Sequence, residues 1–259
     1  MEMDLCNDLI RETLFKVAKE YPQDLINSQL KDIARMTFHI SLVSGGNNLN
    51  ELRLCDLGGG IGLFSVACAA LGARVLLVDD FDDAINRQFG DSIFDLHRKY
   101  GVRVMSRDVV REGMDDIQEQ FDVVTSFESM EHWHHSPKKL FHGVTQTLVH
   151  KGKFVLGTPN CVNLRKRVTV PFGRGKWSSM NDWYEAEVFR GHVREPDVTD
   201  LKYIARDMKL DNIRIFGRNW LGYTSGSLAT RAVTRVIDYP LRLFPALCSD
   251  IYLVGENRH

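Results

Sequence analysis

The chain has 259 residues, of which 44% are hydrophobic and 26% charged, and its formal net charge is −1. This length suits one domain with additions, and it can bury a core without disulfide or metal staples. The near-neutral charge excludes the basic excess typical of a nucleic-acid-binding protein, and five widely spaced cysteines indicate neither a disulfide framework nor a zinc site.

The chain shows no feature of a secreted or membrane-spanning protein. Met1 to Asp4 is acidic where a signal peptide would be basic. No apolar run approaches the ~18 residues that are needed to span a bilayer. We therefore expect a cytoplasmic protein.

The first ~45 residues carry apolar side chains at helical spacing, which predicts two helices separated by Tyr21-Pro22. The run Ser44 to Asn48, with its two glycines, then breaks the pattern. We expect residues 1–48 to form a helical cap and residues 49–259 to form the main domain.

Short apolar strands alternate with helices from residue 52 onward. Strands are predicted at 52–57, 74–78, 102–105, 121–127 and 153–157, with helices at 61–71, 81–100 and 136–149. The last helix begins at Ser136 as N-cap with Pro137 at the first helical position, and Gly152 ends the connection that follows it. This order predicts an α/β fold, a Rossmann-like three-layer sandwich with a mostly parallel sheet that is buried on both faces.

The order is less regular after Pro159. Residues 160–195 are predicted to be an insertion that covers a bound molecule. It is followed by a helix from Glu195-Pro196 to about residue 208, a strand at 210–216 and a last strand at 251–254. Four aromatic side chains of this part could line a pocket or pack the insertion onto the sheet: Trp177, Trp183, Tyr184 and Phe189.

An apolar helical segment at 224–246 carries interspersed arginines. A basic amphipathic helix can lie on a membrane surface. We favour core packing or a homodimer contact over membrane contact, because these origins are commoner for such a segment.

A glycine loop, Gly58 to Gly62, links the first strand to the next helix. Glycines allow a tight turn and let the backbone approach a ligand, and the helix N-terminus supplies free N–H groups. Such a loop alone is equally typical of a plain turn. Asp79 ends the next strand about 20 residues on, where an acidic residue can bind ribose hydroxyls.

Two further acidic residues accompany the loop. Asp56 precedes the glycines directly, where ligand phosphates would be repelled but a cationic ligand is tolerated. Asp108 follows the third strand and could reach an adenine amino group or simply cap a turn.

Together these residues resemble the class I methyltransferases that use S-adenosylmethionine (SAM). The similar segments are Asp56-x-Gly58-x-Gly60-x-Gly62, Asp79, Phe121 to Val124 with Glu128-x-x-Glu131-His132, and Lys151-Gly152-Lys153 to Thr158-Pro159-Asn160. The resemblance covers about residues 50 to 160. The nearest subgroup includes the ubiquinone-pathway O-methyltransferases and many small-molecule, sugar and lipid methyltransferases.

The resemblance implies SAM as cofactor and S-adenosylhomocysteine (SAH) as product, with the loop on the methionine part, Asp79 on the ribose and Asp108 beside the adenine. The cofactor-binding residues that we expect are Asp56, Gly58, Gly59, Gly60, Gly62, Asp79, Asp80, Asp108, Val109 and Phe127. The resemblance also implies a seven-stranded sheet whose last strand is antiparallel, with 210–216 and 251–254 as the hairpin.

Methyl transfer is an in-line displacement on an activated carbon, so alignment matters most, and a base is needed when the acceptor must lose a proton. The candidate catalytic residues are His132, His192 and Glu128, each of which could instead be structural. The run Glu131 to His135 suggests a metal site, but neighbouring side chains on a turn rarely converge, so no metal is expected.

The predicted function is methyl transfer from SAM to a small-molecule or glycan- or lipid-linked acceptor, at oxygen. One alternative is a protein that binds SAM without turnover, because a fold alone does not establish activity. Another is an NAD-dependent oxidoreductase, which Asp56 and the Gly-x-Gly-x-Gly spacing disfavour.

Overall fold

The computed structural model describes residues 2–175 and 178–258. The first part of the chain contains α1 (Glu2–Ala18), α2 (Gln23–Ser44), β1 (Arg53–Leu57), α3 (Leu63–Ala70), β2 (Arg74–Asp79), α4 (Ala84–Tyr100), β3 (Arg103–Ser106), α5 (Val109–Glu112), β4 (Phe121–Phe127), η1 (Met130–His132), α6 (Lys138–Thr147) and β5 (Leu148–Pro159). The rest contains α7 (Leu164–Thr169), η2 (Val170–Phe172), α8 (Met180–Tyr184), α9 (Val198–Asp207), β6 (Asp211–Arg218), α10 (Trp220–Thr224), α11 (Leu228–Leu241), η3 (Pro245–Leu247) and β7 (Asp250–Glu256).

The seven strands form one sheet in the order β3-β2-β1-β4-β5-β7-β6. The pairs along β3-β2-β1-β4-β5 are parallel, while β7 is antiparallel to both β5 and β6. The predicted seven-stranded, mostly parallel sheet with an antiparallel last strand is confirmed.

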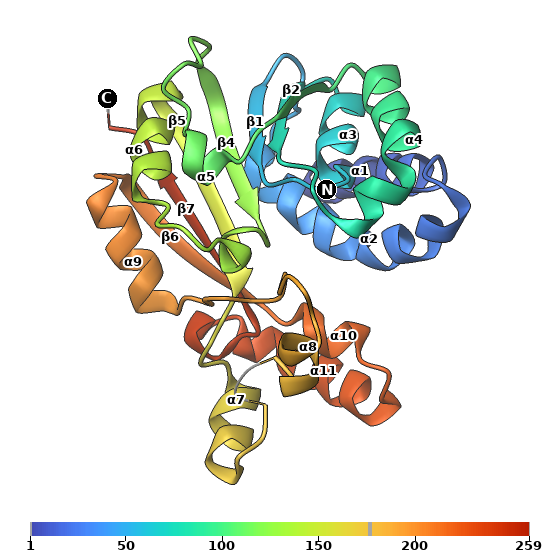
Figure 1. Ribbon diagram of the computed structural model, residues 1–259, viewed down its shortest axis with the longest axis vertical. Coiled ribbons are helices and arrows are strands. Elements are labelled where there is room, and N and C mark those ends of the chain that lie inside the picture. The colour runs from blue at the N-terminus through green and yellow to red at the C-terminus, as the bar shows by residue number, and fades with distance from the viewer. Residues whose placement is uncertain (1, 176–177, 259) are drawn as a thin grey trace.

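Helices cover both faces of the sheet (Figure 1). Helices α1 to α4 lie on one face and α5, α6 and α9 on the other, and each face has its own apolar core. Leu14 and Ile40 of the N-terminal helices are fully buried with Leu54 of β1. The two predicted N-terminal helices are confirmed, and they form part of a sandwich layer.

Three predicted boundaries are wrong for local reasons. β5 begins at Leu148, because Leu148 pairs with Phe121 and Gly152 lies within the strand instead of before it. Helix α6 has Pro137 as its N-cap, and its Lys138 N–H reaches Ser136 Oγ at 3.4 Å. Helix α9 begins after Asp197, whose carboxylate forms a capping box with Asp200, and not at Glu195-Pro196.

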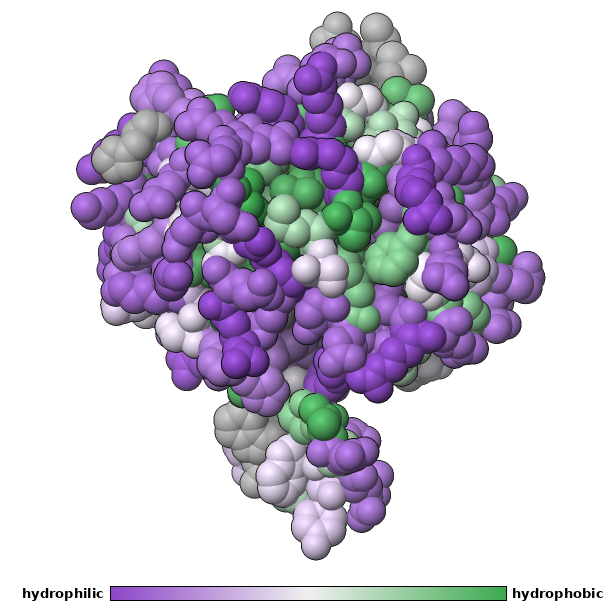
Figure 2. Space-filling model, turned by 45° about the horizontal axis from the view of Figure 1, so that its top comes forward, coloured by the Kyte–Doolittle hydropathy of each residue, from purple (hydrophilic) through white to green (hydrophobic). Residues whose placement is uncertain are grey.

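The segments 160–195 and 220–247 form a lobe below the sheet (Figure 1), containing α7, α8, α10 and α11. Much of its apolar surface faces solvent: Phe172 is 80% exposed, Tyr184 74%, Val236 76% and Tyr239 78%. Figure 2 shows the projecting end of this lobe at the bottom, with apolar and near-neutral residues on its surface. No helix within the described residues is both long and apolar enough to cross a membrane.

Candidate active site

The glycine loop turns sharply between β1 and α3. Gly58, Gly60 and Gly62 all have positive φ values of 70°, 55° and 76°, a region that disfavours side chains. A Cβ on Gly58 would lie 1.9 Å from Ser129 Oγ, so the loop lies against the segment after β4. The predicted strand-loop-helix context of the motif is therefore present.

Asp56 supports this loop from behind. Its carboxylate is 2% exposed and accepts hydrogen bonds from Ser65 Oγ at 2.6 Å and Thr125 Oγ1 at 2.8 Å. Burial raises the pKa of Asp56 to about 6. Because both oxygens are held by hydroxyl groups of α3 and β4, the side chain fixes the loop between its neighbours and does not line either cavity described below.

Asp79 holds the loop from the pocket side. Its carboxylate accepts the Gly60 N–H at 2.8 Å and the Phe81 N–H at 2.9 Å, and burial raises its pKa. Asp108 caps α5 by accepting the Arg111 N–H at 3.1 Å, and it also lines the cavity. Asp108 can therefore cap the helix and still face a ligand in the cavity described next.

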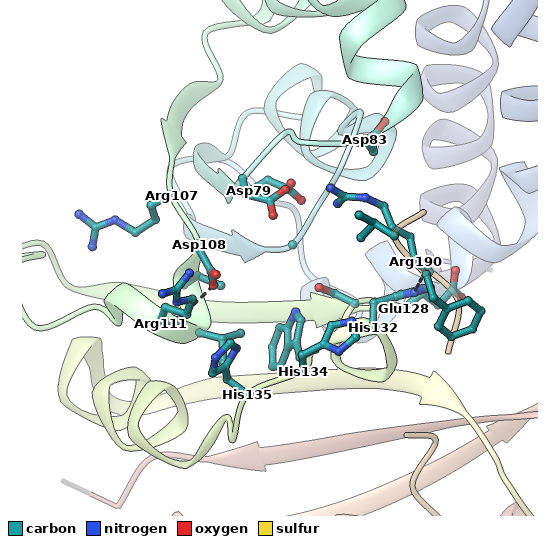
Figure 3. A pocket seen from close by; sticks show the side chains of 18 residues that line it. Asp79, Asp83, Arg107, Asp108, Arg111, Glu128, His132, His134, His135 and Arg190 are labelled. Atoms are coloured by element: carbon teal, nitrogen blue, oxygen red, sulfur yellow. Dashed lines mark hydrogen bonds between the residues drawn. The ribbon is translucent and has the colours of Figure 1, made fainter. Parts of the chain in front are cut away.

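A cavity of about 590 Å³ lies beyond the carboxyl ends of β1 to β4, where open α/β sheets bind their ligands. Figure 3 shows Asp79 between Asp108 on one side and Glu128 with His132 on the other. The insertion contributes Val188, Phe189 and Arg190 to the wall. Arg190 pairs with Asp82 at 2.7 Å, which ties the insertion to the loop after β2.

A second cavity of about 830 Å³ adjoins the first, and Glu128 and His132 line both. Its walls come from α1, α2, the insertion and the segment around α10. They carry charges of both signs, in Arg11, Lys31, Asp32, Arg35, Glu131, Arg165, Lys166, His192, Glu195, Arg242 and Asp250.

Glu128 lies where the two cavities meet. Its carboxylate pairs with Arg35 of α2, 93 positions away, and Arg35 also bonds Asp32 at 2.7 Å. The Glu128 Oε1 atom is buried without a hydrogen-bond partner within the described part of the chain. Burial raises the pKa of Glu128 to about 7, against the opposing effect of Arg35.

His132 and His192 meet at the edge of the second cavity, with ring centroids 4.9 Å apart. Nδ1 of His132 lies 2.9 Å from the Arg190 carbonyl oxygen, and Nδ1 of His192 lies 2.8 Å from Glu195 Oε1. Burial lowers the pKa of His132, whereas the hydrogen bond with Glu195 raises the pKa of His192. Although the Glu195 carboxyl is half-buried, His192 and Lys166 lower its pKa to about 2.

The structure brings most of the predicted site residues to the two cavities. The first cavity is lined by Gly58, Asp79, Asp80, Asp108, Val109, Glu128 and His132, and the second also by His192. Asp56, Gly59, Gly60, Gly62 and Phe127 do not line either of these two cavities, and Phe127 stacks on His39 with centroids 4.0 Å apart.

The four aromatic side chains of the insertion could have lined a pocket or packed on the sheet. Phe189 lines the first cavity, whereas Trp183 is 56% exposed and Tyr184 74%, and neither lines one of these two cavities. Trp177 lies outside the described residues.

Arg35, Ser129 and Arg190 also line the cavities and are not among the site residues expected from the sequence. Glu131 belongs to one of the similar segments but is not among the expected catalytic residues either. The Glu128-x-x-Glu131-His132 spacing was the available signal for Glu131, whereas nothing local marks Arg35 as the partner of Glu128.

The sequence model of one family, described as a methyltransferase domain, matches residues 18–215. None of the curated proteins compared matches this chain.

Several solved structures are similar in fold. A SAM-dependent methyltransferase from Archaeoglobus fulgidus is 18% identical with a TM-score of 0.51, over 86% of this chain and 91% of that one. Magnesium protoporphyrin IX methyltransferase from Synechocystis PCC 6803 with bound SAH is 14% identical with a TM-score of 0.56, over 91% and 88%. Phosphoethanolamine N-methyltransferase 2 from Haemonchus contortus, in complex with SAM, is 13% identical with a TM-score of 0.56, over 87% and 53%.

Proposed function

Because the chain belongs to the methyltransferase-domain family, whose model matches residues 18–215, we propose that it transfers a methyl group from SAM to a hydroxyl of a small-molecule or glycan- or lipid-linked acceptor. The observation that carries this proposal is the pair of adjoining cavities that share Glu128 and His132. One cavity is placed for the donor and the other for the acceptor.

The first cavity suits a cationic donor better than a dinucleotide. Asp79, Asp80, Asp83, Asp108 and Glu128 line it, and carboxylates near a pyrophosphate would repel it. Two of its three arginines are already paired, Arg107 with Asp116 and Arg190 with Asp82. These features support SAM over NAD as the ligand.

In this proposal the glycine loop holds the methionine part of SAM, Asp79 and Asp80 face the ribose, and Asp108 and Val109 lie beside the adenine. Asp56, Gly59, Gly62 and Phe127 act from behind by fixing the loop and the end of β4, while Gly60 leaves open space beside the loop for the ligand. SAM supplies a methyl group on a positively charged sulfur, so the protein mainly has to align donor and acceptor.

The acceptor enters the second cavity, whose polar walls suit a hydroxyl-bearing group. Glu128, His132 and His192 hold the acceptor there, and one of the three receives the proton that its hydroxyl loses. The acceptor oxygen then attacks the methyl carbon, the carbon–sulfur bond breaks, and neutral SAH leaves.

Calorimetry tests the donor. We expect SAH to bind and NADH not to bind. Gly60→Arg should abolish SAH binding, because a Cβ at Gly60 would meet open space and the arginine side chain would occupy the space beside the loop. The φ of Gly60 is 55°, so the substitution also strains the backbone. Gly101→Arg is the matched control: Gly101 has a φ of 73° and equally open space at the end of α4, away from both cavities.

Tight NADH binding without a response to SAH would end the methyltransferase proposal. Turnover is tested by SAH release with a panel of hydroxylated small molecules, glycans and lipid-linked glycans, each paired with its deoxy analogue. Release with a hydroxylated compound but not with its deoxy analogue supports oxygen as the target. SAH binding without release across the panel would favour a SAM-binding protein without turnover.

A further inference from the structure

Three potential metal ligands converge at the edge of the acceptor cavity. Glu131 and His132 belong to η1, while His192 comes from the loop after α8, and one ligand atom of each lies within 4.8 Å of the others. Glu131 is 1% exposed, so the carboxylate is at the buried end of this group. The cluster thus joins Glu131 and His132 to a histidine 60 positions away, and His134 and His135 are not part of it.

Backbone hydrogen bonds hold the His192 loop against η1. The Val193 N–H donates to the Glu131 carbonyl oxygen at 2.7 Å, and the Arg194 N–H donates to the same oxygen at 3.2 Å. Before His192 in the chain, the Arg190 carbonyl oxygen lies 2.9 Å from Nδ1 of His132. The position of His192 relative to Glu131 and His132 is therefore built into the main chain.

Both imidazoles are oriented as metal ligands usually are. A histidine that binds a metal generally donates its other ring N–H to a carbonyl or a carboxylate, which fixes the tautomer. Here Nδ1 of His132 faces the Arg190 carbonyl and Nδ1 of His192 faces Glu195 Oε1. In this arrangement Nε2 of each ring would be the nitrogen that binds the metal.

The nearby cations are already engaged. Lys166 pairs with Glu195, and Arg35 pairs with Glu128 and Asp32. The Glu131 side chain accepts a hydrogen bond from Thr158 Oγ1 at 3.4 Å, and within the described residues no Lys or Arg forms an ion pair with it. His192 of the same cluster is thus the basic side chain that acts on the Glu131 carboxylate, and a metal ion bound between them would compensate the buried charge.

We infer that Glu131, His132 and His192 bind a divalent transition-metal ion beside the acceptor. Two imidazoles and one carboxylate with an open position form the donor set of many catalytic zinc sites. Tetrahedral bonds of about 2.0 to 2.1 Å place ligand atoms about 3.3 Å apart. The three groups must therefore close slightly, which the exposed His132 and His192 side chains allow.

The inference rests on the proposed function for its consequence. An acceptor hydroxyl bound to the metal would lose its proton more readily, and the resulting oxyanion would attack the methyl carbon of SAM as the carbon–sulfur bond breaks. The two imidazoles then serve as ligands, and Glu128, which lines both cavities, is left to receive the proton.

The test measures metal binding without turnover. Chelator-treated full-length protein is titrated with Zn²⁺ by calorimetry and with Co²⁺ by visible absorption, and we expect one ion per chain with a tetrahedral cobalt spectrum. His192→Ala and Glu131→Gln should each weaken binding by at least about tenfold. His134→Ala and His135→Ala are the matched controls, since they lie in the same segment but outside the cluster, and should bind the metal as wild type does.

SAH binding is measured on the same samples. No stoichiometric metal binding, or equal binding by wild type and His192→Ala, overturns the metal site, and the SAM proposal survives if SAH still binds. Metal binding that depends on His192, in a protein that does not bind SAH, supports the site and removes the proposed function. Unchanged SAH affinity in His192→Ala shows that a lost metal does not come from a lost fold.

Discussion

The donor end of this molecule and the lobe below the sheet are built in different ways. The donor end is held by buried polar groups with two partners each, such as Asp56 between Ser65 and Thr125. The lobe of residues 160–195 and 220–247 instead leaves large apolar side chains such as Phe172 and Tyr239 exposed. The geometry for SAM is therefore fixed by the core, while much of the apolar surface of the lobe faces solvent.

The largest expected effect is at the donor end. Asp79→Ala should lower SAH affinity by about 10- to 100-fold, because charged hydrogen bonds to the loop amides are each worth about 1.5–3 kcal/mol. Asp80→Ala is the control, since Asp80 lines the same cavity but does not bind the loop, and it should lose less affinity. Equal losses by calorimetry would show that the loop is not held through Asp79.

The second expected effect is on stability. Asp56→Ala should cost about 1–3 kcal/mol in the free energy of unfolding, because Ser65 and Thr125 lose a buried acceptor. Asp56→Asn should retain the fold, since its amide can still accept from one hydroxyl and donate to the other.

The same pair gives a pH test. Burial raises the pKa of Asp56 from 3.8 to about 6, so the folded protein binds this proton more tightly than the unfolded chain. Stability relative to Asp56→Asn should therefore fall as pH rises from about 4 to 6, by up to ~3 kcal/mol, and then level off. Denaturant titrations of both proteins at pH 4, 5, 6 and 7 measure the difference in their free energies of unfolding. If the wild type gained stability relative to Asp56→Asn as the pH rises, the raised pKa of Asp56 would be contradicted.

The third effect should be confined to the lobe. Asp238 is 1% exposed and accepts from Asn219 and Tyr223 while pairing with Arg242, so it joins α10, α11 and the end of β6. Asp238→Ala should destabilise this region locally by about 3 kcal/mol, because Arg242 and two polar groups lose their partner. Hydrogen exchange should quicken in residues 220–247, with SAH affinity unchanged within about twofold.

Arg235→Ala, at an exposed position of α11, is the control for that variant and should alter neither measurement. If Asp238→Ala weakened SAH binding as strongly as Asp79→Ala, the two ends of the molecule would not be independent.

The smallest effect is expected on the lobe surface. Val236→Ser, at a side chain that is 76% exposed, should change the unfolding free energy by no more than about 0.5 kcal/mol. Val144→Ser, at a fully buried position of α6, should cost about 2 kcal/mol or more. A large loss in Val236→Ser would mean that this surface is covered in solution, by a second copy or another partner.

The donor end could be predicted from the sequence because its signals are local. Gly58 to Gly62 and Asp79 follow strands whose apolar patterns are unbroken, so the motif and its context lie within about 30 residues, the size of one βαβ unit. The acceptor side depends on contacts between distant segments. Arg35 of α2 pairs with Glu128, and the main chain after His192 donates hydrogen bonds to the Glu131 carbonyl oxygen. No local sequence pattern predicts either contact.

The error at the start of β5 has the same origin, whereas those at α6 and α9 come from local capping. Gly152 has the composition of a turn, yet the pairing of Leu148 with Phe121 extends β5 through it. Trp183 and Tyr184 are aromatic as in a pocket wall, yet within the described residues their side chains are 56% and 74% exposed.

The position of β7 affects the order in which the sheet can fold. Its Tyr252 pairs with Gly157 of β5, and its hydroxyl group lies 3.2 Å from His39 of α2 and accepts from Trp220 of the lobe at 2.7 Å. During folding β1 and β2 can pair first, because they are close together in the chain. The pairing of β6 with the rest of the sheet depends on β7, which lies between β5 and β6 but comes last in the chain. Pulse-labelling hydrogen exchange during refolding should accordingly find β1 and β2 protected before the lobe, and the reverse order would contradict this sequence of events.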